Sequence, residues 1–271
     1  MTALGRIIFS DPEFETESLR FVTVKSPALG GRGDVSLFVP PGIEGAIDLP
    51  LVLLLHGVYG SHWNWPFMGG AHRTALEMIQ NGAIAPVILA MPSDGLWGDG
   101  SSYVPHRGAN YESWIVEDVI NGLMQTVAPL SEASPVFISG PSMGGYGAMR
   151  LGAMYPQRFQ GISGHSTVTL FEQMEQVLKR DGASYEVDAT EDGSILYWML
   201  EHRDCLPPLR FDCGVDDGLI EGNRELHQAL ERHGVPHIYE EFEGGHTWSY
   251  WRVHLRDTLR FFDRVLKGER A

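Results

Sequence analysis

The chain has 271 residues, 43% of them hydrophobic and 20% charged, and its formal net charge is −15. This size and balance suit a globular protein with a sizeable core, and no run of about 18 apolar residues predicts a membrane-spanning helix. The negative charge argues against non-specific binding to nucleic acid or to anionic membranes, because phosphate groups repel such a surface.

Short apolar runs alternate with amphipathic helical patterns along the chain, which is typical of a mostly parallel sheet with helices on both faces. The first two runs are joined by a Gly-rich turn, as in an antiparallel hairpin. We predict eight strands, at residues 19–24, 35–39, 51–55, 87–91, 136–139, 160–163, 209–213 and 238–242. Helices are predicted just before Asn81 and at residues 111–127, 146–155, 224–233 and 250–266.

The stretch from 166 to 204 interrupts this alternation, because it contains helical patterns but no strand pattern. It follows a strand directly, and insertions at that edge of a sheet commonly cover a binding site. We therefore expect residues 166–204 to form a small helical cap. No linker-like stretch divides the chain, so residues 1–271 are predicted to form a single domain.

The start of the chain bears on its location in the cell. The apolar stretch at residues 7–9 is too short for the core of a signal peptide, and acidic residues follow it at once. We therefore expect a cytoplasmic protein. The two cysteines, Cys205 and Cys213, form no CxxC pair, and we expect no disulfide between them.

The strongest chemical signal is a G-x-S-x-G motif with Ser142 at its centre. An apolar strand pattern precedes it and a helical pattern follows, which is the strand–turn–helix that a nucleophile elbow requires. The sharp turn needs small neighbours, which Gly140 and Gly144 provide, and the helix N-terminus favours negative charge. A Gly-rich turn with an incidental serine is the alternative; we predict that Ser142 is a nucleophile.

A serine nucleophile needs a base and an acid that orients the base. In folds with a nucleophile elbow, the acid follows the serine along the chain and the histidine follows the acid. Of the eleven histidines, His246 follows a strand and two glycines and precedes the last helix. It should therefore lie in a loop at the carboxyl edge of the sheet. Asp216 and Asp217 both follow the preceding strand, and position alone does not separate them, whereas Asp212 falls inside that strand.

Attack by a serine on a carbonyl carbon also needs two backbone N–H groups to bind the oxyanion that forms. Met143 directly follows the serine and should supply one of them. The other should come from the HG turn after the strand at 51–55, where Val58 is the candidate. His56 in that turn is expected to shape the loop without acting as a second base.

Five segments together resemble the esterase D-related branch of the α/β-hydrolase superfamily: LLLHGVYGSHWNW, NYESWIVEDV, GPSMGGYGAMRLG, CGVDDGLIEGN and GGHTWSYW. The resemblance runs from about residue 51 to 262 and implies an α/β-hydrolase fold. In this branch a CG-x-x-D segment carries the triad acid, which selects Asp217 here. The residue after HG supplies an oxyanion amide in the branch, in agreement with Val58.

The branch includes tributyrin, feruloyl and acetylxylan esterases, S-formylglutathione hydrolases and mycolyltransferases. The loop after HG has no cysteine, unlike that of S-formylglutathione hydrolases, and the chain shows no export signal, unlike mycolyltransferases. The resemblance therefore favours the esterases of the branch over these two groups.

Aromatic residues at the same edge of the predicted sheet suggest the walls of a substrate pocket. We predict that Trp63, Trp65, Trp248 and His165 contact the substrate, and Trp97 and Trp251 also fall in or beside these loops. The alternative for each tryptophan is that it anchors a loop by packing.

We predict a serine carboxylesterase that hydrolyses small acyl or aryl esters through an acyl-enzyme on Ser142. An acyltransferase with an alcohol acceptor would use the same acyl-enzyme, and a non-catalytic binding protein on the same fold is a third reading, which an intact triad disfavours. The partner is a small-molecule ester, and a homo-oligomer is left open. No cofactor is implied, and the acidic turn at 93–100 lacks EF-hand spacing, so no metal is expected.

Overall fold

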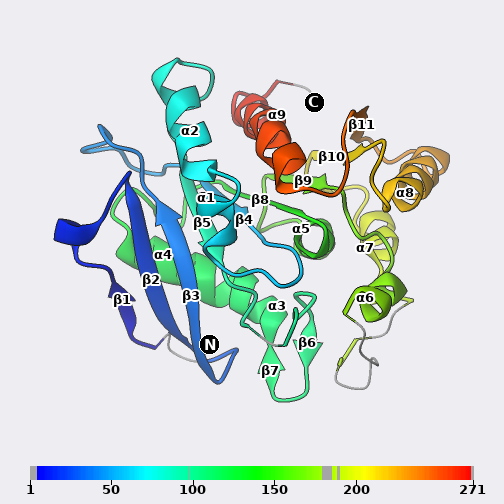
Figure 1. The fold of residues 1–271 in the computed structure, drawn as a ribbon, viewed down its shortest axis with the longest axis horizontal. Helices are drawn as coiled ribbons and strands as arrows, with labels where there is room; N and C mark the ends of the chain where they lie inside the picture. The colour runs from blue at the N-terminus through cyan, green and yellow to red at the C-terminus, as the bar shows by residue number, and fades with distance from the viewer. Residues whose placement is uncertain (1–4, 97, 179–184, 188–189, 270–271) are drawn as a thin grey trace.

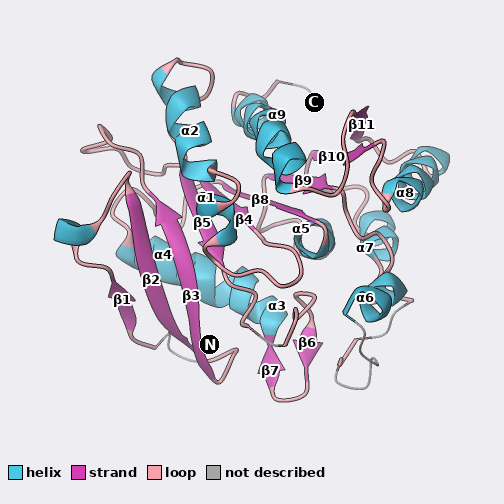
Figure 2. Cartoon of the chain, in the orientation of Figure 1, coloured by secondary structure: helices cyan, strands magenta, loops and turns pink. Residues whose placement is uncertain are grey.

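The fold is that of a computed structural model, which describes residues 5–96, 98–178, 185–187 and 190–269. Within these residues lies a nine-stranded sheet with the order β1-β2-β3-β5-β4-β8-β9-β10-β11, and helices pack on both of its faces (Figures 1 and 2). The strands are β1 Ile7–Phe9, β2 Leu19–Ser26, β3 Gly31–Phe38, β4 Leu51–Leu54, β5 Ile88–Pro92, β8 Val136–Pro141, β9 Gly161–His165, β10 Leu209–Gly214 and β11 Ile238–Phe242.

The sheet is mostly parallel, as predicted. Neighbouring strands pair parallel from β5 through β4, β8, β9 and β10 to β11, whereas the pairs β1–β2, β2–β3 and β3–β5 are antiparallel. The predicted count of eight strands was one too low among the described residues, because β1 was missed. Three residues are too few to show a periodicity, and only pairing such as Ile7 with Val24 makes this segment a strand.

The helices are α1 Asn64–Phe67, α2 Ala71–Gln80, α3 Tyr111–Ser113, α4 Ile120–Thr126, α5 Met143–Met154, α6 Phe171–Leu178, α7 Ile195–Glu201, α8 Ile220–Arg232 and α9 Trp248–Leu266. Beside the large sheet, β6 (Pro105–His106) and β7 (Ala109–Asn110) form a small hairpin. The helix predicted at 111–127 is interrupted by a π-helical segment, Trp114–Val119, between α3 and α4. The indole N–H of Trp114 there donates to the Ser93 carbonyl at 2.8 Å, which ties the segment to the end of β5.

Two hydrophobic cores lie on opposite faces of the sheet, because successive strand residues point to opposite sides. Leu51 and Leu53 of β4 belong to the core beneath α4, α5 and α8, whereas Val52 and Leu54 belong to the core beneath α2 and α9. Burial on both faces explains why this strand is an unbroken apolar run in the sequence.

The parallel strands bring distant loops to one edge of the sheet. β4, β8, β10 and β11 all point the same way, and each is followed by a predicted site residue: Val58, Ser142, Asp217 and His246 respectively. The four loops therefore meet at the carboxyl edge, where open α/β sheets place their sites.

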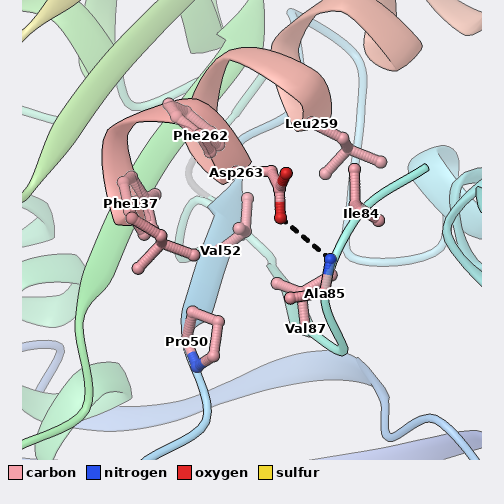
Figure 3. Close-up of a pocket in the computed structure, with 10 residues that line it drawn as sticks. Pro50, Val52, Ile84, Ala85, Val87, Phe137, Leu259, Phe262 and Asp263 are labelled. Carbon is pink, nitrogen blue, oxygen red and sulfur yellow. Dashed lines mark hydrogen bonds between the residues drawn. The ribbon is translucent and has the colours of Figure 1, made fainter. Parts of the chain in front are cut away.

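A small crevice lies at the opposite end of the strands (Figure 3). It is formed by the amino ends of β4 and β8, the segment before β5 and the last turns of α9. Its lining is apolar except for Asp263, which accepts a hydrogen bond from the Ala85 N–H at 2.9 Å. The crevice is part of the packing between α9 and the sheet, on the side away from the predicted site.

The described parts of residues 166–204 include α6 and α7, which lie beside α5 and α8 (Figure 1). The Tyr146 hydroxyl of α5 donates to the Gly193 carbonyl at 2.7 Å, and the Arg150 guanidinium bonds the Asp192 carbonyl. The segment is thus anchored to the helix that follows Ser142. Its role as a cap, and the assignment of residues 1–271 to a single domain, stay predictions.

Arg150 also forms a buried ion pair with Glu112 of α3, at 2.6 Å. We expect Arg150→Met to lower the free energy of unfolding by about 3–5 kcal/mol, because it leaves the Glu112 carboxylate in the interior without a cationic partner. The double variant Arg150→Met/Glu112→Leu should lose less than the single variant, since no unpaired charge remains. Urea unfolding of the three proteins measures both losses, and a double variant less stable than Arg150→Met would contradict this account.

Candidate active site

Ser142, His246 and Asp217 form one hydrogen-bonded chain. The Ser142 Oγ lies 3.1 Å from Nε2 of His246. On the other side of the ring, Nδ1 lies 2.9 Å and 3.1 Å from the two carboxylate oxygens of Asp217. The structure therefore brings together three residues that lie on three separate loops of the chain.

The turn between β8 and α5 holds Ser142 in a rare backbone conformation, with φ 57° and ψ −122°. A β-carbon at Gly144 would lie 2.7 Å from the carbonyl oxygens of Leu55 and His56, and one at Gly140 would lie 2.6 Å from the Gly144 backbone. Only glycine lets the turn approach the end of β4 so closely. The Ser142 N–H donates to the His165 carbonyl at 3.0 Å and ties the turn to β9.

Asp217, rather than Asp216, bonds His246. The Asp217 side chain is buried, whereas Asp216 is exposed. Burial alone would raise the pKa of Asp217, but hydrogen bonds from His246 and from the Leu219 N–H hold this pKa below its ordinary value. The carboxylate therefore stays ionised beside the imidazole, and tertiary geometry separates two neighbours that position along the chain did not.

His246 lies in the loop between β11 and α9, after Gly244, whose φ of 122° suits glycine. The edge of Trp251 packs against the imidazole, with ring centroids 4.9 Å apart at 89°. The His246 side chain is 38% exposed, while that of Asp217 is 1% exposed. The ring thus joins a buried carboxylate to a serine that lines an open cleft.

Two backbone N–H groups were predicted to bind the oxyanion: that of Val58, in the loop after β4, and that of Met143, which directly follows Ser142. Met143 is the first residue of α5, where an N–H has no partner within the helix. Gly57 approaches Ser142 so closely that a β-carbon on it would lie 3.4 Å from the serine Cβ. Among the described residues, neither N–H has a hydrogen-bond partner, so both are available to bind an oxyanion.

A cleft opens above the serine, lined by Gly57, Val58, Asn64, Ser142, His246, Thr247, Trp248 and Trp251. Trp248 is the one predicted substrate contact in this lining. Trp251 also lines the cleft; it follows Trp248 by three residues on α9, and that spacing puts both on one helix face. Asn64 and Thr247 were missed, and nothing in their sequence context marks them.

Two of the tryptophans predicted to contact the substrate, Trp63 and Trp65, lie outside the lining of the cleft. Trp65 is 1% exposed, its indole N–H donates to the Leu55 carbonyl at 2.8 Å, and its ring supports Trp248 from behind at 5.4 Å. Trp63 is 43% exposed and does not line the cleft. Trp97 lies outside the described residues.

The prediction for His165 is wrong for a physical reason. Its side chain is 0% exposed, with Nδ1 2.8 Å from Asp212 and Nε2 3.0 Å from the Thr258 hydroxyl. Burial would raise the pKa of Asp212, but His165 and Arg210 hold it at about 2. The side chain of the last residue of a strand points either to the cleft or to the interior. Here the side chain of His165, the last residue of β9, points to the interior, where it bonds the buried carboxylate of Asp212.

The described part of the chain contains neither a cluster of potential metal ligands nor a membrane-spanning helix. No group of three or more His, Cys, Asp or Glu side chains there could hold a metal ion. None of the helices within it is long and apolar enough to cross a membrane. Both cysteines are free.

Comparison with known proteins identifies the family. Residues 26–262 match the sequence model of a protein family described as "Putative esterase". The chain belongs to this esterase family. The predicted resemblance to esterases is confirmed, and the protein is a carboxylic ester hydrolase with an α/β-hydrolase fold.

Individual relatives agree with the family. An acetyl esterase from Caldicellulosiruptor saccharolyticus is 29% identical over 236 residues, which cover 80% of this chain and 85% of that protein. A ferulic acid esterase superposes with a TM-score of 0.77 at 21% identity, over 96% of this chain and 98% of its own. An S-formylglutathione hydrolase from Staphylococcus aureus gives 0.74 at 20% identity, over 95% and 99%.

The strained turn of the esterase generates a prediction about stability. We expect Ser142→Gly to be more stable than Ser142→Ala by about 1 kcal/mol, because glycine relieves backbone strain of about 1–3 kcal/mol and loses about 0.5–1 kcal/mol to chain entropy. Thermal and urea unfolding of the two variants measure the difference. Equal stabilities would mean that the strain at this residue is no larger than the entropy cost of glycine, about 0.5–1 kcal/mol.

Proposed function

We propose that the esterase is a serine carboxylesterase in which Ser142 is the nucleophile, His246 the general base and Asp217 the acid that orients the base. The observation that carries this proposal is the hydrogen-bonded chain from the Ser142 hydroxyl through the imidazole to a buried, ionised carboxylate. A serine hydroxyl is too weakly acidic to attack an ester unaided, and this arrangement supplies the base that it needs.

In the first half-reaction, the Ser142 Oγ bonds to the ester carbonyl carbon as its proton passes to Nε2 of His246. The N–H groups of Val58 and Met143 bind the oxyanion that forms. When the tetrahedral intermediate collapses, the bond to the alcohol oxygen breaks and His246 returns the proton to the departing alcohol. An acyl group then remains on Ser142.

In the second half-reaction, water attacks the acyl-enzyme and gives its proton to His246. The carboxylic acid leaves, and Ser142 regains its proton. The 38% exposure of the His246 side chain favours water as the acceptor, because solvent reaches the base directly. This favours hydrolysis over transfer of the acyl group to an alcohol.

The substrates proposed are small neutral acyl or aryl esters. Two indole rings and the Val58 side chain make the cleft mainly apolar, so an anionic group would lose its hydration there without a cationic partner. The net charge of −15 opposes anions further. An acetyl esterase among the relatives and a ferulic acid esterase among the structural neighbours support an acyl group in this size range. A cytoplasmic location stays a prediction, and the oligomeric state stays open.

The assignment of the acid can be tested with neighbouring carboxylates. We expect Asp217→Asn to lower kcat by about 10⁴, because the imidazole loses the partner that sets its tautomer and stabilises its charge. Asp216→Asn is the matched control and should change kcat by less than about threefold, since that side chain is exposed and lies outside the chain of hydrogen bonds.

Hydrolysis of p-nitrophenyl acetate measures both variants, with Ser142→Ala as the background. A fluorophosphonate probe should label the wild type at Ser142 and leave Ser142→Ala unlabelled. A larger loss in Asp216→Asn than in Asp217→Asn would reject the assignment, as would substantial activity in Ser142→Ala.

Trp248 is proposed to limit the size of the acyl group. Trp248→Ala should raise the ratio of kcat/KM for p-nitrophenyl hexanoate to that for the acetate by about tenfold, because it opens room for added methylenes. Trp63→Ala removes a tryptophan that does not line the cleft, and should leave this ratio within about twofold. Equal losses for all esters in Trp248→Ala would make Trp248 a structural support only.

A further inference from the structure

His56 lies beneath the loop that carries Val58, and its side chain is buried. Its Nδ1 lies 2.7 Å from the Gly57 carbonyl oxygen, and its Nε2 lies 2.9 Å from the Asp94 N–H. A carbonyl oxygen only accepts a hydrogen bond and a backbone N–H only donates one. The two partners therefore fix a neutral imidazole with its proton on Nδ1 and a lone pair on Nε2.

The bond to Gly57 determines where the next N–H points. A trans peptide is planar, with its C=O and N–H on opposite sides. When His56 holds the Gly57 oxygen on the interior side, the N–H of Val58 in the same peptide points the other way. Gly57 is the residue next to the serine Cβ and lines the cleft with Val58, so that other side is the side of Ser142.

The Gly57 carbonyl has a second donor, the Gly60 N–H at 3.2 Å. A β-carbon at Gly60 would lie 2.4 Å from Nδ1 of His56, so the turn closes around the imidazole only with glycine there. The Tyr59 N–H donates to the Asp99 carbonyl at 2.8 Å, which ties the same turn to the loop after β5. The turn from Gly57 to Gly60 thus packs around the imidazole of His56.

The backbone of His56 is held by Tyr103. The Tyr103 hydroxyl accepts from the His56 N–H and donates to the His56 carbonyl, each at 3.0 Å. Burial raises the pKa of Tyr103 well above its ordinary value, so the hydroxyl keeps the proton that it donates. Ser102 and Tyr103 both adopt positive φ, at 57° and 56°, an uncommon conformation for two successive non-glycine residues that persists where the surroundings enforce it.

We propose that His56 is a positioning residue, which acts through the Gly57 carbonyl to aim the Val58 N–H at the oxyanion. Tyr103 holds the His56 backbone, and the Asp94 N–H holds the imidazole. This proposal rests on the proposed function, in which Val58 supplies one of the two oxyanion donors. Glycine at position 57 allows its peptide to rotate, so without the imidazole N–H only the longer bond from the Gly60 N–H, at 3.2 Å, holds the Gly57 carbonyl away from Ser142.

Three variants separate this role from simple packing. In His56→Asn, the amide nitrogen stands near the position of Nδ1 and can still donate to Gly57, whereas His56→Gln reaches toward Asp94 instead and His56→Leu has no donor. With p-nitrophenyl acetate, we expect the Gln and Leu variants to lose about 10²–10³ in kcat with KM within about threefold, as for loss of one oxyanion donor. The Asn variant should stay within about tenfold of the wild-type kcat.

The tautomer gives a second readout that does not depend on activity. In ¹⁵N-histidine NMR spectra, the resonances that are present in the wild type and absent from His56→Asn belong to His56. These resonances should show a protonated Nδ1 and an unprotonated Nε2. Activity of His56→Leu or His56→Gln within threefold of wild type would overturn the proposal, as would equal losses in Asn and Gln or a proton on Nε2. If His56→Leu does not fold, the comparison of Asn with Gln decides.

Failure of the proposed function would look different. The wild type would then lack ester hydrolysis, or Ser142→Ala would retain it, whatever the His56 variants did. Intact hydrolysis that depends on Ser142, together with normal kcat in the His56 variants, would reject only the positioning role of His56.

Discussion

The close approach of the turn at Ser142 to the end of β4 is the constraint on which the site depends. It is set by two positions without side chains, Gly140 and Gly144, where a β-carbon would meet backbone atoms at 2.6–2.7 Å. This approach brings Ser142 beside Gly57 and puts the first N–H of α5 next to the loop after β4. The nucleophile and both oxyanion donors therefore share one contact between two neighbouring parallel strands, and the energy of core packing maintains it.

The acid and base come from strands farther along the sheet, and aromatic rings connect them to this contact. His246, Trp251, Trp248 and Trp65 meet edge to face in succession, with centroids 4.9 to 5.4 Å apart. The last ring donates to the carbonyl of Leu55, beside the oxyanion loop. Such contacts are stabilising and directional. Trp248 and Trp251 thus form a wall of the cleft, and through Trp65 they connect the base to the oxyanion side.

The sequence by itself determined the parallel sheet, its loops and the chemistry that the loops carry. Unbroken apolar runs mark the doubly covered strands, and the G-x-S-x-G motif between a strand and a helix marks Ser142. His246 could be chosen among eleven histidines because it follows a strand and precedes a helix. These inferences rest on local patterns and on the rule that parallel strands end at one edge, so they need no knowledge of side-chain direction.

Only the tertiary structure decided which side chains meet. Position along the chain left Asp216 and Asp217 equivalent, and the bond to His246 separates them. His165 was expected in the cleft, but a buried carboxylate on the neighbouring strand turns it inward. The tautomer of His56 follows from two backbone groups, one of them 38 residues away. In each case the direction of a side chain depends on a partner distant in sequence, and no local pattern encodes that partner.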